Sequence, residues 1–204
     1  MVSLKTGILG GTFDPIHTGH LILAEEVKKR LGLDEIIFIP TGQPYYKADK
    51  AISPAADRLN MVKLAISGKP YFRVMDIEIK RSGPTYTADT LNDLKLILPE
   101  KTELYFILGW DNLEALPRWH KASEIIRLCQ LVAVPRIGQA KPDVDELDDK
   151  LPGLQQSLIM LSKPEVDVSS SLVRERLENG QGVEHLVPEA VAAYIKEHGL
   201  YHRQ

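Results

Sequence analysis

The chain has 204 residues, of which 44% are hydrophobic and 26% charged. This size and composition are typical of a globular α/β protein and exclude a disordered or fibrous chain. The formal net charge of −3 gives no global attraction to nucleic acid, so we expect no nucleic-acid partner and only a local phosphate site.

The sequence carries no evident targeting or membrane-spanning segment. No long apolar stretch follows a basic region at its start, and no apolar run approaches the ~20 residues that span a bilayer. We therefore expect a cytoplasmic protein with no membrane partner. Cys129 is the single cysteine, and its apolar surroundings predict a buried structural thiol. The oligomeric state stays open, a homo-oligomer included.

Short apolar, β-branched runs alternate along the chain with segments of helical period. We predict strands over residues 6–10, 35–40, 72–79, 103–108, 131–135 and 158–161. Because parallel strands need crossovers, this alternation predicts an α/β fold with a Rossmann-like, doubly wound parallel sheet in a single domain over 1–204. Ligand sites in such sheets lie at the carboxyl ends of the strands.

Residues that are typical of helix starts and ends predict three helices between the strands. The first predicted helix starts near Thr18 and stops at Gly32. The next has Ser53 as its N-cap and Pro54 at its first position. A third is expected to be capped by Thr87.

The last third of the chain contains one irregular segment and two well-formed helices. Residues 136–153 are rich in proline, glycine and acidic residues with little apolar periodicity, so we expect a surface excursion there. Residues 168–180 and 187–201 both have the pattern of helices that end at glycine, and they are the predicted C-terminal helices of the domain.

Two glycines and two histidines follow the first predicted strand. Gly10 and Gly11 permit positive φ and a close approach of a ligand to the backbone. His17 falls directly before the first helix and His20 in its first turn, so two imidazoles and free backbone N–H groups converge on one spot. An anion, most commonly phosphate, is the expected ligand. The alternative is that the two rings merely brace the turn.

Other phosphate and metal motifs are absent from this region. The string is neither the Gly-x-Gly-x-x-Gly of NAD-dependent dehydrogenases nor the Gly-x-x-x-x-Gly-Lys-Ser/Thr of P-loop proteins. A histidine pair three residues apart has no clustered Cys or His elsewhere to complete tetrahedral ligation, so the residues do not favour a zinc site.

A second group of anion-binding candidates lies in the first of the two C-terminal helices. Ser170 and Ser171 stand at its start, and Arg174 follows one turn later. Hydroxyls at such a position cap the helix or contact an anion. Lys47, in a loop with Gly and Pro, is a further candidate phosphate contact.

Aromatic and acidic residues gather after the ends of other strands. Tyr86, Trp110 and Trp119 offer faces to a flat heterocycle, although tryptophans in a core are the ordinary alternative. Asp111 is suited to a ribose hydroxyl or a ring partner. No nucleophile–base pair is evident, so a phosphate-centred site implies direct displacement at phosphorus, catalysed by positioning and charge neutralisation.

Two strings resemble the signatures of the nucleotidyltransferase superfamily. GGTFDPIHTGH (10–20) is similar to Gly-x-Phe-x-Pro-x-His-x-Gly-His, and VSSSLVR (168–174) is similar to Ile-Ser-Ser-Thr-x-x-Arg. Within that superfamily, SGPTYTADTLNDL (82–94), LGWDNLEALPRW (108–119) and LVPEAVAAYIKEHGLY (186–201) resemble the bacterial nicotinate-nucleotide adenylyltransferases. The resemblance covers nearly the whole chain.

The resemblance implies an activity in NAD biosynthesis. ATP and nicotinate mononucleotide would give deamido-NAD and pyrophosphate, with Mg²⁺ carried mainly by the ATP phosphates and no protein metal ligand. The implied catalytic residues are His17, His20 and Arg174. The implied ATP-binding residues are Gly10, Gly11, Thr12, Phe13, His17, His20, Lys47, Ser170, Ser171 and Arg174. The implied mononucleotide-binding residues are Tyr86, Thr87, Asp111 and Trp119, with Trp119 stacked on the pyridine ring.

The sequence departs from the pattern of the family at a few positions. PYYK, ending at Lys47, stands where the family commonly has Pro-Pro-His-Lys, so Tyr46 replaces a histidine and any ligand contact of that histidine is in doubt. Val168 and Ser171 replace isoleucine and threonine in the second signature, and both keep the character of the residue they replace.

Two alternatives to this function remain. One is the same adenylyl transfer to nicotinamide mononucleotide or to another phosphate acceptor such as phosphopantetheine. The other is a non-catalytic nucleotide sensor on the same fold, against which the presence of both histidines and Arg174 argues.

Overall fold

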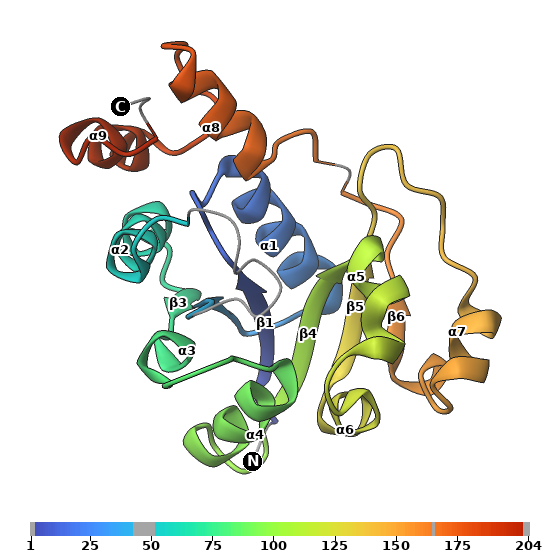
Figure 1. Ribbon diagram of the computed structural model, residues 1–204. Helices are drawn as coiled ribbons and strands as arrows, with labels where there is room; N and C mark the ends of the chain where they lie inside the picture. The colour runs from blue at the N-terminus through green and yellow to red at the C-terminus, as the bar shows by residue number, and fades with distance from the viewer. Residues whose placement is uncertain (1–2, 43–51, 165, 202–204) are drawn as a thin grey trace.

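A six-stranded parallel sheet forms the centre of the molecule (Figure 1). The computed structural model describes residues 3–42, 52–164 and 166–201. The strand order is β3-β2-β1-β4-β5-β6. Strands β2 and β3 are added on one side of β1 and strands β4 to β6 on its other side, so the topological switch point lies between β1 and β4. The strands are β1 (Lys5–Gly11), β2 (Glu35–Pro40), β3 (Phe72–Val74), β4 (Glu103–Gly109), β5 (Gln130–Val134) and β6 (Leu158–Met160). The predicted fold class is confirmed.

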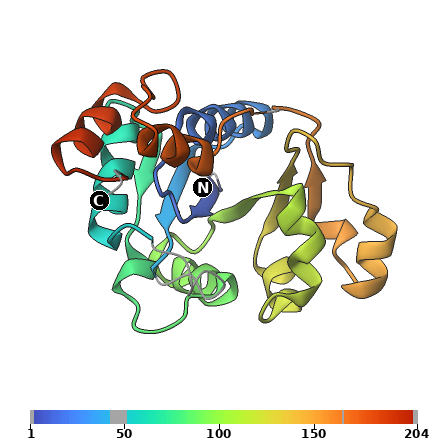
Figure 2. The same cartoon turned by 45° about the horizontal axis from the view of Figure 1, so that its top comes forward.

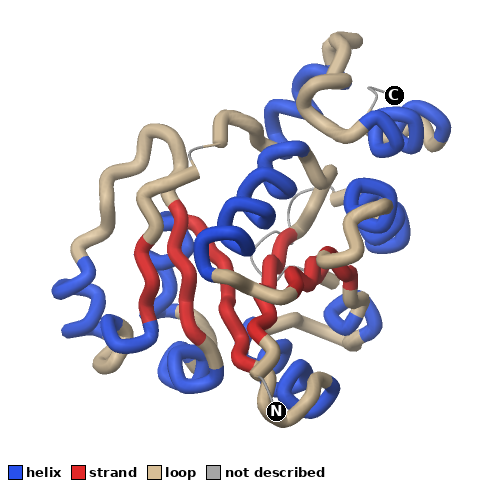
Figure 3. The backbone as a smooth tube through the Cα atoms, turned by 180° about the vertical axis from the view of Figure 1, so that it is seen from behind, coloured by secondary structure: helices blue, strands red, loops and turns tan. Residues whose placement is uncertain are grey.

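Helices cover both faces of this sheet. In Figure 2 the blue helix α1 and the orange-red α8 lie along the upper side, and the green α4 lies below. In Figure 3, which views the molecule from the side opposite to Figure 1, α1 lies in front of the strands. The helices are α1 (Thr18–Leu31), α2 (Ala55–Ile66), α3 (Ile77–Lys80), α4 (Thr87–Ile97), α5 (Trp110–Ala115), η2 (Leu116–Arg118), α6 (Ala122–Leu128), α7 (Val144–Lys150), η3 (Gln155–Ser157), α8 (Ser170–Glu178) and α9 (Glu189–Glu197).

Alternate residues of the buried strands enter two separate hydrophobic cores. In β1, Ile8 packs under α4 and α6, whereas Leu9 packs with α1, α2, α8 and α9. Phe106 and Ile107 of β4 divide between the two cores in the same way. Both faces of a parallel sheet must be covered, and this alternation supplies an apolar surface to each layer of helices.

The predicted strand over 72–79 is wrong beyond Val74. Ile36 pairs with Phe72 and Phe38 with Val74, so the same register would bring Pro40 opposite residue 76. Proline has no backbone N–H to donate to the ladder. The chain turns away there and forms α3, whose Glu78 is buried and accepts a hydrogen bond of 2.8 Å from the Thr90 hydroxyl.

Two predicted helix caps are also wrong by one residue. Pro54, not Ser53, is the N-cap of α2, because the backbone of Ser53 is used elsewhere: its N–H donates to Asp14 and its carbonyl accepts from Arg58. Tyr86, not Thr87, is the N-cap of α4. The predicted start of α1 after His17 and its end at Gly32, which has a φ of 60°, are confirmed.

The segment 136–153 contains α7, which packs on the sheet. Leu147 and Leu151 are 6% and 4% exposed and belong to the core beneath α4 and α6. The expected surface excursion therefore describes only the stretch before the helix, where residues 136–141 are exposed. Cys129 is buried as predicted, and burial raises the pKa of its thiol to about 12. In the residues that the structure describes, no helix is long and apolar enough to cross a membrane.

Candidate active site

The turn that connects β1 to α1 is held by a buried network. Phe13 lies at a φ of 49°, the left-handed region that side chains rarely adopt, and is only 2% exposed. The next residue, Asp14, is 5% exposed, and its carboxylate accepts a hydrogen bond of 2.6 Å from the Tyr201 hydroxyl. Buried Arg58 donates to the Thr12 carbonyl at 2.7 Å and to the Gly42 carbonyl at 3.1 Å. A strained turn persists only where its surroundings over-determine it, and this network does so here.

The two histidines form a stacked pair at the start of α1. His17 is the N-cap and His20 the third helical residue, and their ring centroids lie 3.7 Å apart. The His17 backbone N–H donates to Nδ1 of His20 at 3.2 Å. Gly19 permits this packing, because a Cβ there would lie 2.9 Å from Nδ1 of His17 and would overlap the side chain of Val166. The edge of Phe13 contacts His20, with 5.0 Å between the ring centroids.

Both imidazoles are neutral near pH 7. Burial, with a smaller effect from the positive charge of Arg136, lowers the pKa of His17 to about 4. Burial, followed by His17 and Arg136, lowers the pKa of His20 well below its usual value. Since Nδ1 of His20 accepts a hydrogen bond, its neutral ring carries the proton on Nε2. His20 therefore offers one N–H donor to a ligand, next to the backbone N–H groups of the helix start.

The second signature packs directly on the first. The Ser170 hydroxyl donates to the Pro15 carbonyl at 2.9 Å, and the Arg174 guanidinium donates to the Asp14 carbonyl at 2.6 Å. Another nitrogen of Arg174 lies 3.4 Å from the hydroxyl of Ser171, which is exposed. Because a guanidinium has five N–H groups, these contacts leave donors for a phosphate. The structure thus brings Gly10 to Phe13, both histidines and the second signature together, while Lys47 lies outside the described residues.

A salt bridge joins the segment after β5 to the first turn of α5, which follows the end of β4. Asp111, in the first turn of α5, accepts a hydrogen bond of 3.2 Å from Arg136, the cation that acts on both imidazoles. The other carboxylate oxygen of Asp111 and the indole nitrogen of Trp110 are buried and have no hydrogen-bond partner in the described part of the chain. Polar atoms of this kind are suited to a ligand, since a buried unpaired group is costly.

The remaining candidates, Tyr86, Thr87 and Trp119, lie at the start of α4 and after η2. Tyr86 lies against His120, with 4.4 Å between the ring centroids. Trp119 is partly buried after η2 and meets Phe106 edge to face at 6.3 Å. Thr87 is the first residue of α4, beside Tyr86. The Trp119 ring is therefore packed partly as a core residue, the alternative that the sequence left open.

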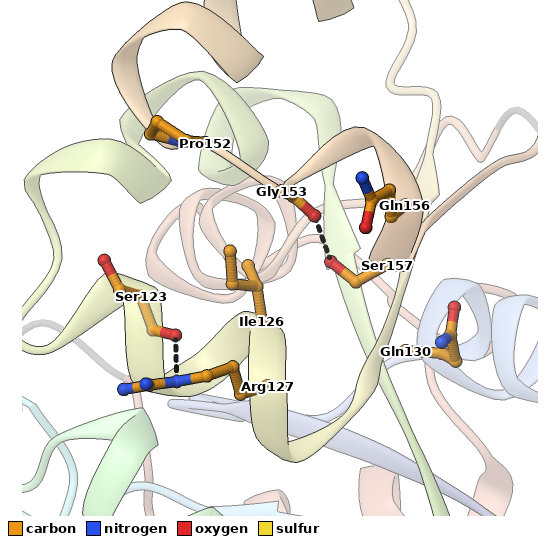
Figure 4. A pocket seen from close by; sticks show the side chains of 8 residues that line it. All are labelled: Ser123, Ile126, Arg127, Gln130, Pro152, Gly153, Gln156 and Ser157. Carbon is orange, nitrogen blue, oxygen red and sulfur yellow. Dashed lines mark hydrogen bonds between the residues drawn. The ribbon is translucent and has the colours of Figure 1, made fainter.

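A polar cleft of about 450 Å³ lies at the opposite end of β5 (Figure 4). Two of its polar side chains bond within the wall of the cleft: Arg127 donates to the Ser123 carbonyl at 3.1 Å, and the Ser157 hydroxyl donates to the Leu154 carbonyl at 3.1 Å. The lining residues are Ser123, Ile126, Arg127, Gln130, Pro152, Gly153, Gln156 and Ser157. None of the candidate residues is among them, so the site at the carboxyl ends of the strands is the better candidate.

Comparison with known proteins shows the family to which this chain belongs. A family model described as cytidylyltransferase-like matches residues 8–176. A Dehalococcoides mccartyi (strain CBDB1) protein with the name "Probable nicotinate-nucleotide adenylyltransferase" is 91% identical over all 204 residues of both chains. A Roseiflexus (strain RS-1) protein of the same name is 45% identical over 98% of this chain and 100% of its own length. This chain belongs to the nicotinate-nucleotide adenylyltransferase family.

The fold of this family member is also found in distant solved structures. Nicotinic acid mononucleotide adenylyltransferase of Plasmodium falciparum, complexed with NaAD, superposes with a TM-score of 0.78 at 22% identity, over 97% of each chain. The same protein complexed with APC gives a TM-score of 0.77 at 21% identity. At such identities the likeness concerns the arrangement of the chain.

Three residues of the site were missed in the sequence. Arg136 had a signal, because it follows the buried run of β5 and so lies at the carboxyl edge of the sheet. Arg58 had a weaker one, since it stands on the same helix face as Met61, Val62 and Ala65, which are buried. Tyr201 had none, because the residue it contacts is 187 positions away.

Proposed function

We propose that this adenylyltransferase transfers AMP from ATP to nicotinate mononucleotide. A phosphate oxygen of the mononucleotide attacks the α-phosphorus of ATP in line, the bond to the bridging oxygen breaks, and pyrophosphate leaves with the electron pair. The products are deamido-NAD and pyrophosphate. No covalent enzyme intermediate is needed, so the residues act by positioning and charge neutralisation.

The observation that carries this proposal is the pair of neutral, stacked imidazoles at the start of α1. Nε2–H of His20 and the backbone N–H groups beside it are fixed donors for the negative charge that develops on the transferred phosphate. His17 supplies the second imidazole. Arg174, already held by the Asp14 carbonyl, supplies a full positive charge through its remaining N–H groups, and the Ser171 hydroxyl lies beside it.

The backbone from Gly10 to Phe13 would line the ATP pocket, with Lys47 and Ser170 completing its contacts. On the other side, Tyr86, Thr87 and Trp119 would surround the pyridine ring and ribose of the mononucleotide. The unpaired oxygen of Asp111 would accept a hydrogen bond from this substrate. Arg136, which pairs with Asp111 and lowers the pKa of His17, would lie between the two halves.

The proposed cofactor is Mg²⁺ bound to the ATP phosphates, where it neutralises charge. Among the described residues, no three His, Cys, Asp or Glu side chains gather in a group that could hold a metal ion. The metal would enter with the nucleotide. Since ATP and pyridine nucleotides are cytoplasmic metabolites, we propose the cytoplasm as the place of action.

Pyrophosphate release from ATP, measured separately with nicotinate and nicotinamide mononucleotide, tests this function. We expect turnover with the nicotinate form to exceed that with the nicotinamide form. Equal or greater turnover with the nicotinamide form would contradict the substrate assignment, and no turnover with either would favour a sensor.

A further inference from the structure

The side chain of Asp14 is buried inside the protein, with 5% of the residue exposed. It lies in the turn between the proposed ATP-binding backbone and the catalytic pair, three residues before His17. Its oxygens are used internally: one accepts from the Tyr201 hydroxyl at 2.6 Å, and the other from the Ser53 backbone N–H at 3.4 Å. The carboxylate therefore stabilises the conformation of the turn.

Tyr201 reaches this carboxylate from a constrained position after α9. Its φ is 62°, in the left-handed region that residues with a side chain rarely adopt. Burial and the neighbouring Asp14 raise the pKa of its hydroxyl, so the hydroxyl stays protonated and remains a donor. Such a backbone persists when the rest of the structure fixes it, here through the bond to Asp14.

The same part of the chain contacts the turn at three more places. The Arg174 guanidinium donates to the Asp14 carbonyl at 2.6 Å. The Ser170 hydroxyl donates to the Pro15 carbonyl. At the start of α1, both the N–H and the hydroxyl of Thr18 donate to the Leu186 carbonyl, at 2.9 and 3.0 Å. Residues 170–201 thus contact the turn before, at and after its proline. Figure 1 shows α8 beside the start of α1. Of these contacts, the bond from Tyr201 is the one made between two side chains.

We propose that Tyr201 is a positioning residue for adenylyl transfer, acting through Asp14 to fix the turn that places His17 and His20. This rests on the proposed function. A donor contributes to a transition state only when it lies within a fraction of an ångström of the developing charge, and a misplacement of about 1 Å costs on the order of 10²-fold in rate. Loss of the Tyr201 hydroxyl lets the turn relax, which lowers kcat more than it raises KM.

The chain provides a matched control in Tyr194. Its hydroxyl donates to Asp57 at 2.8 Å and accepts from Asn60 at 3.2 Å, which ties α9 to α2. Tyr194→Phe and Tyr201→Phe each remove one tyrosine–aspartate bond of the C-terminal region and keep the ring. The two variants should lose similar stability in urea unfolding.

Kinetics separate the two variants. We expect Tyr201→Phe to lower kcat by about tenfold or more with a smaller change in KM, and Tyr194→Phe to keep wild-type values. In an Asp14→Ala background, Tyr201→Phe should lower kcat no further, because both changes remove the same bond. Wild-type kcat in Tyr201→Phe, an equal loss in Tyr194→Phe, or additive losses with Asp14→Ala would each overturn the proposal.

A readout independent of substrate keeps the proposal distinct from the proposed function. In ¹⁵N NMR spectra of the imidazoles, the wild type and Tyr194→Phe should show one set of His17 and His20 signals, with the His20 proton on Nε2. Tyr201→Phe should show shifted or exchange-broadened signals. Unchanged spectra in Tyr201→Phe would overturn the role of Tyr201 even if the wild type proved to have another substrate.

Discussion

His20 uses the two nitrogens of one ring for different purposes. Nδ1 accepts the backbone N–H of His17 and so closes the start of α1, which leaves Nε2–H for the role that we propose, as a donor to the substrate. A replacement can separate the two roles, because an asparagine carbonyl can occupy the place of Nδ1 while nothing replaces Nε2.

We therefore expect His20→Asn and His20→Ala to lower kcat alike, by about 10²–10³-fold, the usual cost of removing one transition-state donor. ATP affinity, measured by calorimetry, should change by less than about tenfold in His20→Asn. Near-normal turnover in His20→Asn with a large loss in His20→Ala would show that the ring acts as a helix cap and not as a catalytic donor.

Among individual residues, the sequence predicted those whose place in the structure depends only on residues nearby in the chain. The separation of His17 and His20, and their position before and within the first helical turn, required only the glycines, the proline and the start of a helical pattern. Tyr201 and Arg58 could not be predicted, because their partners Asp14 and Thr12 are distant in sequence and become neighbours only when α9 and α2 pack.

Among the elements, α7 shows where composition misleads. Five acidic residues and a proline on either side made 136–153 resemble a solvated loop, yet Leu147 and Leu151 are four apart and face the sheet together. Only two apolar residues fall within this short helix, too few for periodicity to distinguish it. The end of β3 at Val74 was also not predicted, because it depends on the register between β3 and β2.

We expect Leu151→Ala to lower the free energy of unfolding by about 2–4 kcal/mol, because it removes a side chain that is 4% exposed from the core. Ile137→Ala, in the same segment but at a residue 53% exposed, should change it by less than about 0.5 kcal/mol. Urea unfolding of both variants makes the comparison. Equal effects would mean that α7 does not belong to the core.

For the whole molecule, the buried histidines make stability depend on pH. An unfolded histidine takes up its proton near pH 6.5, whereas His17 in the fold does so only near pH 4. Between these values the unfolded chain binds more protons, so the fold loses stability as the pH falls. The contribution of His17 is fully present above about pH 6.5 and amounts to roughly 3 kcal/mol at most.

Urea unfolding between pH 7 and pH 4 measures this dependence. His17→Asn should make it shallower, with the remainder due partly to His20. His185→Asn is the control, since His185 is exposed, and it should keep the wild-type slope. A slope unaffected by His17→Asn would show that the imidazole of His17 is already solvated in the fold.

The bond between Tyr201 and Asp14 also sets the order in which the molecule can become active. A ribosome makes Asp14 among the first residues and Tyr201 187 residues later. Every strand of the sheet is synthesised before this bond can form. A nascent chain can thus collapse around its sheet while the turn after β1 still lacks its contacts with residues 170–201. If Tyr201 has the positioning role that we propose, adenylyl transfer begins only after these residues have docked.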